Sequence, residues 1–287
     1  MRRRQFSRHG FVYIHKRPSL TSRAVLDELL KRIPGKAGLE GILDPFAQGL
    51  LIAAYGAATR LLSYLHLYPK EYEGEVVFGV DTDSGDPTGK VTGYGKTEHL
   101  DENLIRKTIP CFLGEQEQKP PRFSNVKIGG KRAHVLSRSQ QMVDLRPRRI
   151  FVHELQLSRT TEKDVWTIYA KVSKGTYLRA LVRDFAQALG TVGHLRRLIR
   201  TAIGPVKLSD ARFVEEIDEK NLLPADAPFM SWPALELSQE EYLQLLKGGK
   251  IKRPSASGMV RLYTGGVFVG LGRGQGNEVY PERLPQF

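Results

Sequence analysis

Strand-like patterns of hydrophobic and polar residues occupy three clear stretches of this chain, at residues 10–18, 72–80 and 165–172, and the last alternates most regularly. A period of two is typical of strands that bury one face. Apolar residues recur instead at helical spacing in residues 21–31 and 178–189, which predicts amphipathic helices there. This mixture predicts an α+β fold for the body of the chain.

A mostly apolar stretch at residues 46–67, interrupted by Gly49 and Gly56, predicts a further helix. Asp44 and Pro45 stand directly before it. Asp is a favoured N-cap, and Pro fits the first helical position, where no N–H is needed. Two interpretations remain open. The pair either starts a helix and does nothing more, or the backbone N–H groups and the helix dipole hold Asp44 ionised and nucleophilic.

The later parts of the chain suggest an excursion, a linker and an appendage. Residues 119–149 are polar and basic and lack long periodic segments, which indicates an excursion from the core. Three prolines between residues 224 and 233 predict a linker. Beyond it, residues 235–287 combine a short helix at 239–246 with strand-like segments. The sequence therefore predicts an α+β body followed by a small, mainly β appendage.

The net charge of +13 over 287 residues predicts a polyanionic partner, either nucleic acid or an anionic membrane surface. The membrane is the less expected partner, because no basic amphipathic helix stands out and no apolar run reaches the roughly 18 residues that span a bilayer. The single cysteine, Cys111, cannot form an intramolecular disulfide, and no signal peptide is evident. We expect a cytoplasmic protein that binds nucleic acid.

Several patterns that suggest other chemistries fail on spacing. The glycines at 270–276 suggest a dinucleotide loop, but only eleven residues follow them, too few for a βαβ unit. A calcium loop starting at Asp81 would need an acidic residue where Thr92 stands. The seven histidines lack metal-ligand spacing. We therefore expect no metal and no cofactor.

Residues 41–51 read Gly-Ile-Leu-Asp-Pro-Phe-Ala-Gln-Gly-Leu-Leu. This string resembles the catalytic-aspartate motif of the TruB family of tRNA pseudouridine synthases. Four further stretches resemble motifs of the same family in the same order along the chain, at residues 10–22, 70–89, 118–133 and 173–200. Five matches in the right order make the resemblance specific.

The resemblance implies a pseudouridine synthase catalytic domain over residues 1–229, with a mixed, largely antiparallel sheet flanked by helices. An RNA-clasping insertion would lie around 119–149, and a small, mainly β, PUA-like RNA-binding domain at 230–287. The implied reaction is the isomerisation of the T-loop uridine (position 55) of tRNA to pseudouridine. It would proceed by flipping the base into a pocket, without metal or cofactor.

The resemblance also implies roles for individual residues. Asp44 would be the nucleophile, attacking either the base or the ribose, and Arg179 would pair with it and keep it ionised. Tyr177 would line the pocket and could move a proton. The residues implied in substrate binding are Tyr72, stacked on the flipped uracil, Leu198 as an apolar wall, Arg200 and Lys16.

The residue types alone favour a plainer interpretation of the same positions. A single tyrosine, such as Tyr72, or a leucine at helical spacing, such as Leu198, is more often a core residue. Arg179 and Arg183 lie four residues apart and could form a solvated helix face. Only the combination of motifs favours the functional interpretation.

Clusters of basic residues fit contacts to RNA phosphates, which set affinity without reading sequence. The resemblance implies the T-arm of tRNA as the partner, no obligatory protein partner, and a monomer. The basic residues expected to bind RNA are Lys119, Arg122, Lys127, Lys131, Arg132, Arg196 and Arg197.

The main departure from the family pattern is Leu39-Glu40, where the family usually has His-Thr. The histidine of the family contacts RNA near the flipped nucleotides, so its replacement predicts altered engagement of the substrate. Two alternatives to the leading function follow. The first is a pseudouridine synthase with a changed RNA target, and the second is a non-catalytic tRNA-binding or tRNA-folding factor.

Overall fold

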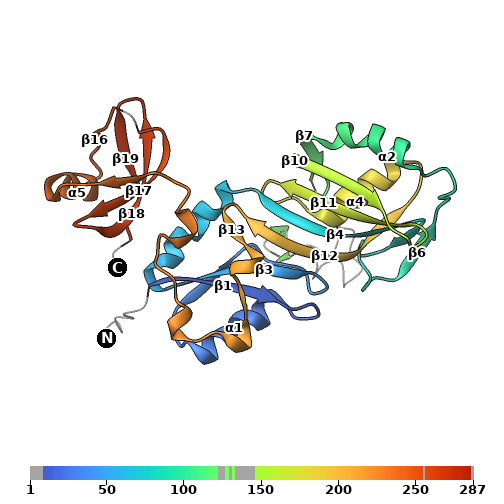
Figure 1. The fold of residues 1–287 in the computed structure, drawn as a ribbon, viewed down its shortest axis with the longest axis horizontal. Helices are drawn as coiled ribbons and strands as arrows, with labels where there is room; N and C mark the ends of the chain where they lie inside the picture. Colours follow the sequence, from blue (N-terminus) through green and yellow to red (C-terminus); the bar gives the residue numbers. More distant parts are fainter. Residues whose placement is uncertain (1–8, 122–126, 129–130, 133–145, 255, 286–287) are drawn as a thin grey trace. The chain divides into compact units, whose positions relative to one another are not determined.

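The computed structural model describes residues 9–121, 127–128, 131–132, 146–254 and 256–285. By its internal contacts the chain divides into two compact units. The first unit comprises Met1–Asp44, Gly49–His66 and Gly204–Phe287. The second unit comprises Pro45–Gln48 and Leu67–Ile203. Figure 1 labels the helices and strands of both.

The body of the first unit contains strands in the order β14-β1-β3-β2. Strand β1 runs antiparallel to β3 and parallel to β14. Helix α1 begins where the sequence predicts, because Thr21 Oγ1 accepts a hydrogen bond from Ala24 N at 3.0 Å. The elements of this body are β1 (Gly10–Lys16), α1 (Ser22–Arg32), β2 (Ala37–Glu40), β3 (Gln48–Tyr55), η1 (Gly56–Leu67), β13 (Val206–Lys207), η3 (Leu208–Asp210), β14 (Arg212–Phe213), η4 (Val214–Glu216), η5 (Glu219–Asn221) and η6 (Ala227–Phe229), where η denotes a 3₁₀ helix.

The helix predicted at residues 46–67 is wrong. The stretch forms strand β3 and then the 3₁₀ helix η1. Asp44 and Pro45 accordingly lie in a loop that leads into a strand, not at a helix start. Seven of the eight residues of β3 are buried. A strand buried on both faces is a continuous apolar run, which periodicity cannot distinguish from a buried helix.

The C-terminal part of the first unit has a sheet and a core of its own, which confirms the predicted small, strand-rich domain. The strand order is β15-β17-β18-β19-β16, and helix α5 (Gln239–Leu246) lies at the predicted position. The strands are β15 (Ala234–Glu236), β16 (Ile251–Lys252), β17 (Gly258–Thr264), β18 (Val267–Gln275) and β19 (Glu278–Arg283). Its buried core consists of Leu237, Leu245, Ile251, Val260, Leu262, Val269 and Val279.

The predicted linker at residues 224–233 is packed rather than solvated. Phe229 is fully buried and meets Phe11 of β1 edge-on, with ring centroids 5.9 Å apart. Arg261 of β17 forms an ion pair with Asp226 at 3.2 Å. The hydroxyl of Tyr263 also donates to Asp226, and burial together with this contact raises the pKa of Tyr263 to about 12. The prolines therefore mark a turn-rich segment that the first unit fixes in place.

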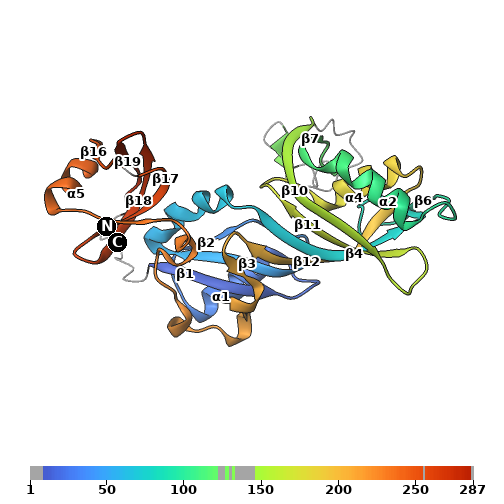
Figure 2. The ribbon, with the colours of Figure 1, turned by 45° about the horizontal axis from the view of Figure 1, so that its top comes forward.

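The second unit is built on an antiparallel sheet with strand order β12-β4-β11-β10-β7. Figure 2 shows α2 and α4 beside this sheet. A hairpin, β5–β6, extends from the end of β4. The elements are β4 (Lys70–Phe78), β5 (Val80–Thr82), β6 (Val91–Tyr94), α2 (Glu102–Thr108), η2 (Ile109–Phe112), β7 (Gly114–Gln118), β8 (Lys127–Ile128), β9 (Lys131–Arg132), β10 (Arg148–Arg159), β11 (Val165–Val172), α4 (Leu178–Ala188) and β12 (Gly193–Ile203).

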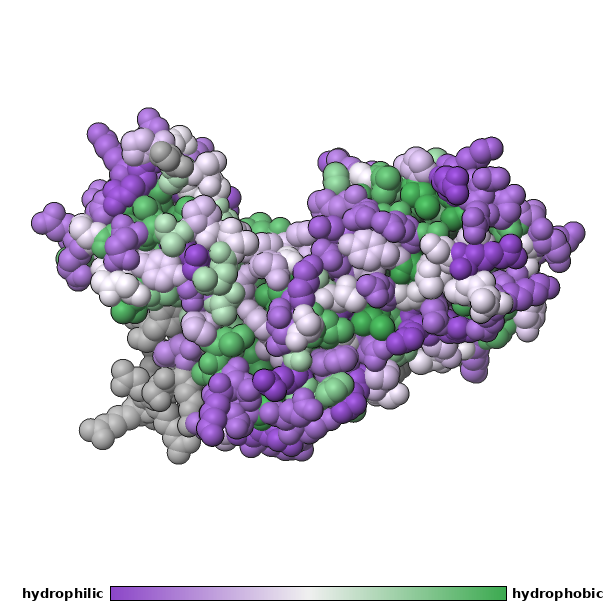
Figure 3. All heavy atoms as spheres, viewed as in Figure 1, coloured by the Kyte–Doolittle hydropathy of each residue, from purple (hydrophilic) through white to green (hydrophobic). Residues whose placement is uncertain are grey.

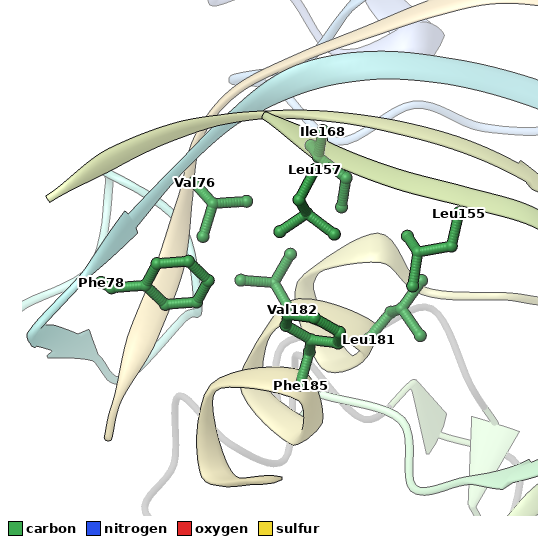
Figure 4. A pocket seen from close by; sticks show the side chains of 8 residues that line it. All are labelled: Val76, Phe78, Leu155, Leu157, Ile168, Leu181, Val182 and Phe185. Atoms are coloured by element: carbon green, nitrogen blue, oxygen red, sulfur yellow. The ribbon is translucent and has the colours of Figure 1, made fainter. Parts of the chain in front are cut away.

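The core of the second unit lies between the sheet and α4. As predicted, the apolar positions of α4 share one face, and Leu181, Val182 and Phe185 are each at most 3% exposed. Figure 4 shows these side chains meeting others from three strands. The strand residues are Val76 and Phe78 of β4, Leu155 and Leu157 of β10, and Ile168 of β11. This packing fixes the first turn of α4, which carries predicted site residues, against the sheet.

Hydrophilic residues cover most of the face seen in Figure 3, with smaller hydrophobic areas between them. In the part of the chain that the structure describes, no helix combines the length and apolar character needed to cross a membrane.

Candidate active site

Asp44 lies in the loop between β2 and β3, and this loop is anchored directly before it. Ser22 Oγ donates to the carbonyl of Leu43 and accepts from its N–H, both at 3.0 Å. Ser22 is 2% exposed, so the hydrogen bonds are shielded from water. Gly41 begins the loop with a φ of 63°, which favours glycine. Backbone anchoring, rather than a helix start, therefore positions the carboxylate.

Arg179 is buried in the first turn of α4, with 4% of its side chain exposed. Its Nη1 donates to the carbonyl of Ser84 at 2.7 Å and lies 3.3 Å from Asp86 Oδ2. The interpretation of Arg179 and Arg183 as parts of a solvated helix face is thus wrong for Arg179. A buried guanidinium needs such partners because an unpaired buried charge is costly.

Asp86 was missed by the sequence analysis, and its own turn holds it rigidly. Oδ1 of Asp86 accepts from Ser84 Oγ at 2.8 Å and from Thr88 N at 3.0 Å. A Cβ at Gly89 would lie 2.3 Å from Ser84 Oγ, so the turn closes only with glycine at this position. The signal that could have identified Asp86 is its place in the motif at residues 70–89.

Tyr177 precedes α4, and its backbone is held from both sides by Gln118 of β7. Tyr177 N donates to Gln118 Oε1 at 2.8 Å, and Gln118 Nε2 donates to the Tyr177 carbonyl at 3.1 Å. Gln118 is 3% exposed. This paired contact fixes the entry into α4 and hence the position of Arg179 two residues later. Gln118 was not singled out from the sequence, although it opens the motif at 118–133.

Tyr72, Leu198 and Arg200 lie together on two neighbouring strands. In the register of β4 with β12, Arg200 stands opposite Tyr72 and Leu198 opposite Gly74. All three side chains are buried, at 8%, 6% and 1% exposure respectively. Leu198 lies in a strand, not at the helical spacing considered for it. Position 74 needs glycine, because a Cβ there would lie 2.3 Å from the carbonyl oxygen of Arg197.

The strand alternation places this group on the same sheet face as α4. Tyr72, Val76 and Phe78 occupy alternate positions of β4, so their side chains share a face. Figure 4 shows Val76 and Phe78 directed toward α4, whose first turn carries Arg179. The second unit therefore brings Tyr72, Tyr177, Arg179, Leu198 and Arg200 to one face of its sheet. Asp44 and Lys16 belong to the first unit, and the pairing of Asp44 with Arg179 stays a prediction.

Lys16 ends β1 and is fully buried. Its Nζ donates to the carbonyl of Arg17 at 3.1 Å, and its cross-strand partner is Gly49 at the start of β3. A lysine side chain is rarely fully buried, because removing its ammonium from water is costly. Its burial here indicates that Lys16 has a structural or functional role.

The residues predicted to bind RNA are in several environments. Lys119 is exposed, and its carbonyl accepts from Arg183 at 3.0 Å. Arg196 pairs with Glu75 at 2.8 Å and with Glu162 at 2.6 Å, whereas the side chain of Arg197 is 55% exposed. The backbones of Lys127, Lys131 and Arg132 form the short hairpin β8–β9, and Arg122 lies outside the described residues.

Among the residues that the structure describes, no three His, Cys, Asp or Glu side chains gather as a metal site. The site instead combines aromatic rings, guanidinium groups and carboxylates, which can stack on a base and orient charge around it.

Family models match two parts of the chain. Residues 29–178 match the TruB family pseudouridylate synthase (N terminal domain), and residues 233–284 match the Pseudouridine synthase II TruB C-terminal model. Among solved structures, a chain of a Cbf5-Nop10-Gar1 complex aligns with a TM-score of 0.70 at 22% identity. That alignment covers 96% of this chain and 85% of the other, and it shows a shared fold.

Two curated relatives, each matched over nearly its full length, carry the same name. A tRNA pseudouridine synthase B of Caldanaerobacter subterraneus subsp. tengcongensis is 34% identical, over 96% of this chain and 98% of the relative. The tRNA pseudouridine synthase B of Aquifex aeolicus is also 34% identical, over 96% and 99% of the two chains. Near-complete coverage at this identity, together with the two matched models, shows that the chain is a member of the TruB family of pseudouridine synthases.

Proposed function

We propose that the chain converts the T-loop uridine (position 55) of tRNA to pseudouridine, with Asp44 as the nucleophile. The curated relatives support tRNA as the substrate class. The observation that carries the proposal is the cluster on one sheet face of the second unit, where Arg179 is fixed by Ser84 and Asp86 on the same face as buried Tyr72. Within the proposal, residues 1–229 form the catalytic domain and residues 230–287 an RNA-binding domain.

The proposed reaction is an isomerisation, so substrate and product have the same composition and no redox partner is needed. The bond between C1′ and N1 of uracil breaks, the base turns, and a bond forms between C1′ and C5. The proton on C5 is then lost and N1 gains one. Asp44 serves as the nucleophile whether it attacks the ribose or the base.

Each remaining residue of the site has a role in this scheme. The ring of Tyr72 stacks on the flipped uracil and returns roughly 1–3 kcal/mol of the cost of unstacking it. Leu198 forms an apolar wall, while Arg200 and Lys16 bind the substrate. Arg179 orients the carboxylate of Asp44 and stabilises its ionised form. Tyr177 moves a proton at the reacting base.

The basic residues would bind the phosphates of the T-arm. The insertion contributes Lys119, Arg122, Lys127, Lys131 and Arg132, and strand β12 contributes Arg196 and Arg197. Binding through phosphates predicts an affinity that falls steeply with salt.

The test of the reaction is tritium release from C5-labelled uridine in a T-arm stem-loop. The native chain should release tritium, and Asp44→Asn should reduce release to background, because the amide is a poor nucleophile of nearly the same shape. Asp27→Asn is the matched control, since Asp27 lies half-exposed on α1 in an ion pair with Arg23 at 2.9 Å. Equal release by Asp44→Asn and the native chain would eliminate Asp44 as the nucleophile.

A second candidate is a pseudouridine synthase with a changed RNA target, and the observation that favours it is Leu39-Glu40 in place of His-Thr. Salt-sensitive binding of the T-arm without tritium release by the native chain would favour this candidate. Assaying labelled total RNA for pseudouridine formation would then locate the target.

A further inference from the structure

Glu40 is an unexpected residue to find beside an RNA site. It ends β2, one residue before the loop that carries Asp44, and it stands opposite Ile52 of β3. Asp44 follows Glu40 four positions later in the chain, so their Cα atoms lie within about 14 Å of one another. An exposed carboxylate at this position would repel RNA phosphates. The structure avoids this repulsion by burying Glu40, which is 3% exposed.

His66 covers the buried carboxylate. Its Nε2 lies 2.7 Å from Glu40 Oε2, and 41% of the His66 side chain is exposed. His66 comes from the last turn of η1, which packs closely on β2, since a Cβ at Gly38 would lie 3.0 Å from Leu62. The group presented to solvent at this place is therefore an imidazole rather than a carboxylate.

A histidine bound to a carboxylate through one ring nitrogen is oriented for the other nitrogen to bind a ligand. With Nε2 directed at Glu40, Nδ1 is on the opposite side of the ring. In its protonated form the ring donates through Nδ1, and a phosphate oxygen is a suitable acceptor. Both residues and Asp44 belong to the first unit, so this geometry lies within one compact unit.

We propose that His66 binds a phosphate of the substrate RNA beside the target uridine, and that Glu40 is the positioning residue that orients its ring. The inference rests on the proposed RNA substrate and adds a specific contact to it. It also gives Leu39-Glu40 a physical meaning, because Glu40 and His66 together supply a histidine next to the aspartate loop.

The test is binding of a fluorescent T-arm stem-loop by anisotropy over a series of salt concentrations. His66→Gln is the informative variant, because the glutamine amide can still donate to Glu40 while the imidazole is gone. We expect its Kd to rise by roughly 10- to 100-fold, as for the loss of a hydrogen bond to a charged group. The slope of log Kd against log salt should fall, but by less than the roughly 0.7–0.9 of one full phosphate contact, because Glu40 already balances part of the charge on the ring.

Glu40→Gln tests the positioning role. This variant should raise Kd in the native background and have no further effect in a His66→Gln background, because Glu40 acts through His66. His153→Gln is the matched control, since His153 lies exposed on β10 of the second unit, and it should leave Kd unchanged. Thermal unfolding of each variant shows whether it retains the native fold.

An unchanged Kd and salt slope for His66→Gln would overturn the inference. An equal effect of Glu40→Gln with and without His66 would overturn the positioning role. The binding measurement needs no turnover, so it is separate from the test of the reaction. If the native chain binds the stem-loop without releasing tritium, the proposed function fails, whereas the comparison of His66→Gln with the native chain still decides the inference.

Discussion

The Asp86 carboxylate determines where Arg179 can lie. Arg179 and Asp86 are both almost fully buried, with side-chain exposures of 4% and 6%. The ion pair joins α4 to the turn after β5, and two hydrogen bonds within that turn, both accepted by Oδ1, fix Asp86 in place. An orientation set this far from solvent depends little on salt and strongly on each partner.

Asp86→Asn should therefore destabilise the fold, by up to about 3–5 kcal/mol, because it breaks a buried ion pair with Arg179. Urea unfolding followed by circular dichroism measures the change. Asp83→Asn is the control from the same turn. Asp83 is exposed and accepts from Lys90 N at 2.9 Å, and its loss should cost at most about 1 kcal/mol. Equal costs for the two variants would show that burial of the pair contributes nothing.

Individual residues also show what sequence could not reveal. Tyr72 and Arg200 stand opposite each other in adjacent strands although 127 positions separate them, and no local pattern predicts such a register. Only the family resemblance placed them in one pocket. Asp86 and Gln118 escaped notice because each acts on a residue far along the chain. Asp86 pairs with the side chain of Arg179, and Gln118 holds the backbone of Tyr177.

At the level of elements, the amphipathic segments were predictable and the buried strand was not. Helices α1, α4 and α5 and strand β11 agree with their predicted positions, since each buries one face and exposes the other. Strand β3 has no exposed face to contrast with a buried one, because seven of its eight residues are buried. Gly49, which weakened the helix prediction, instead marks the point where the aspartate loop enters β3.

Gly49→Ala tests this boundary. Gly49 has a φ of 113°, a region that side-chain-bearing residues rarely adopt. We expect the alanine to destabilise the fold by about 1–3 kcal/mol through backbone strain. Gly93→Ala in β6 is the control, because nothing lies within 4 Å of the added Cβ. Its unfolding free energy should change by less than about 0.5 kcal/mol. A neutral Gly49→Ala would mean that the loop relaxes without cost.

For the whole molecule, the net charge of +13 is the clearest guide to the partner, but it overstates the charge available to RNA. Some basic side chains already form ion pairs with acidic neighbours, whereas others face solvent. Arg196 lies within 2.8 Å of Glu75 and 2.6 Å of Glu162, and these contacts, first of all the hydrogen bond to Glu162, raise its pKa. Arg197, its neighbour, is 4.0 Å from Glu75 and more exposed.

Neutralising these two arginines should therefore have different effects on RNA binding. Arg197→Gln should lower the slope of log Kd against log salt by about 0.7–0.9, as expected for one released counterion. Arg196→Gln should lower it by clearly less, because the Arg196 guanidinium is already neutralised by two carboxylates. It should also cost up to about 1 kcal/mol of stability, the value of a partly exposed ion pair. Anisotropy titrations of a T-arm stem-loop, with urea unfolding of the same samples, measure both quantities. Equal reductions in slope would mean that RNA displaces Glu75 and Glu162 from Arg196, and that the count of basic residues alone determines the electrostatic part of binding.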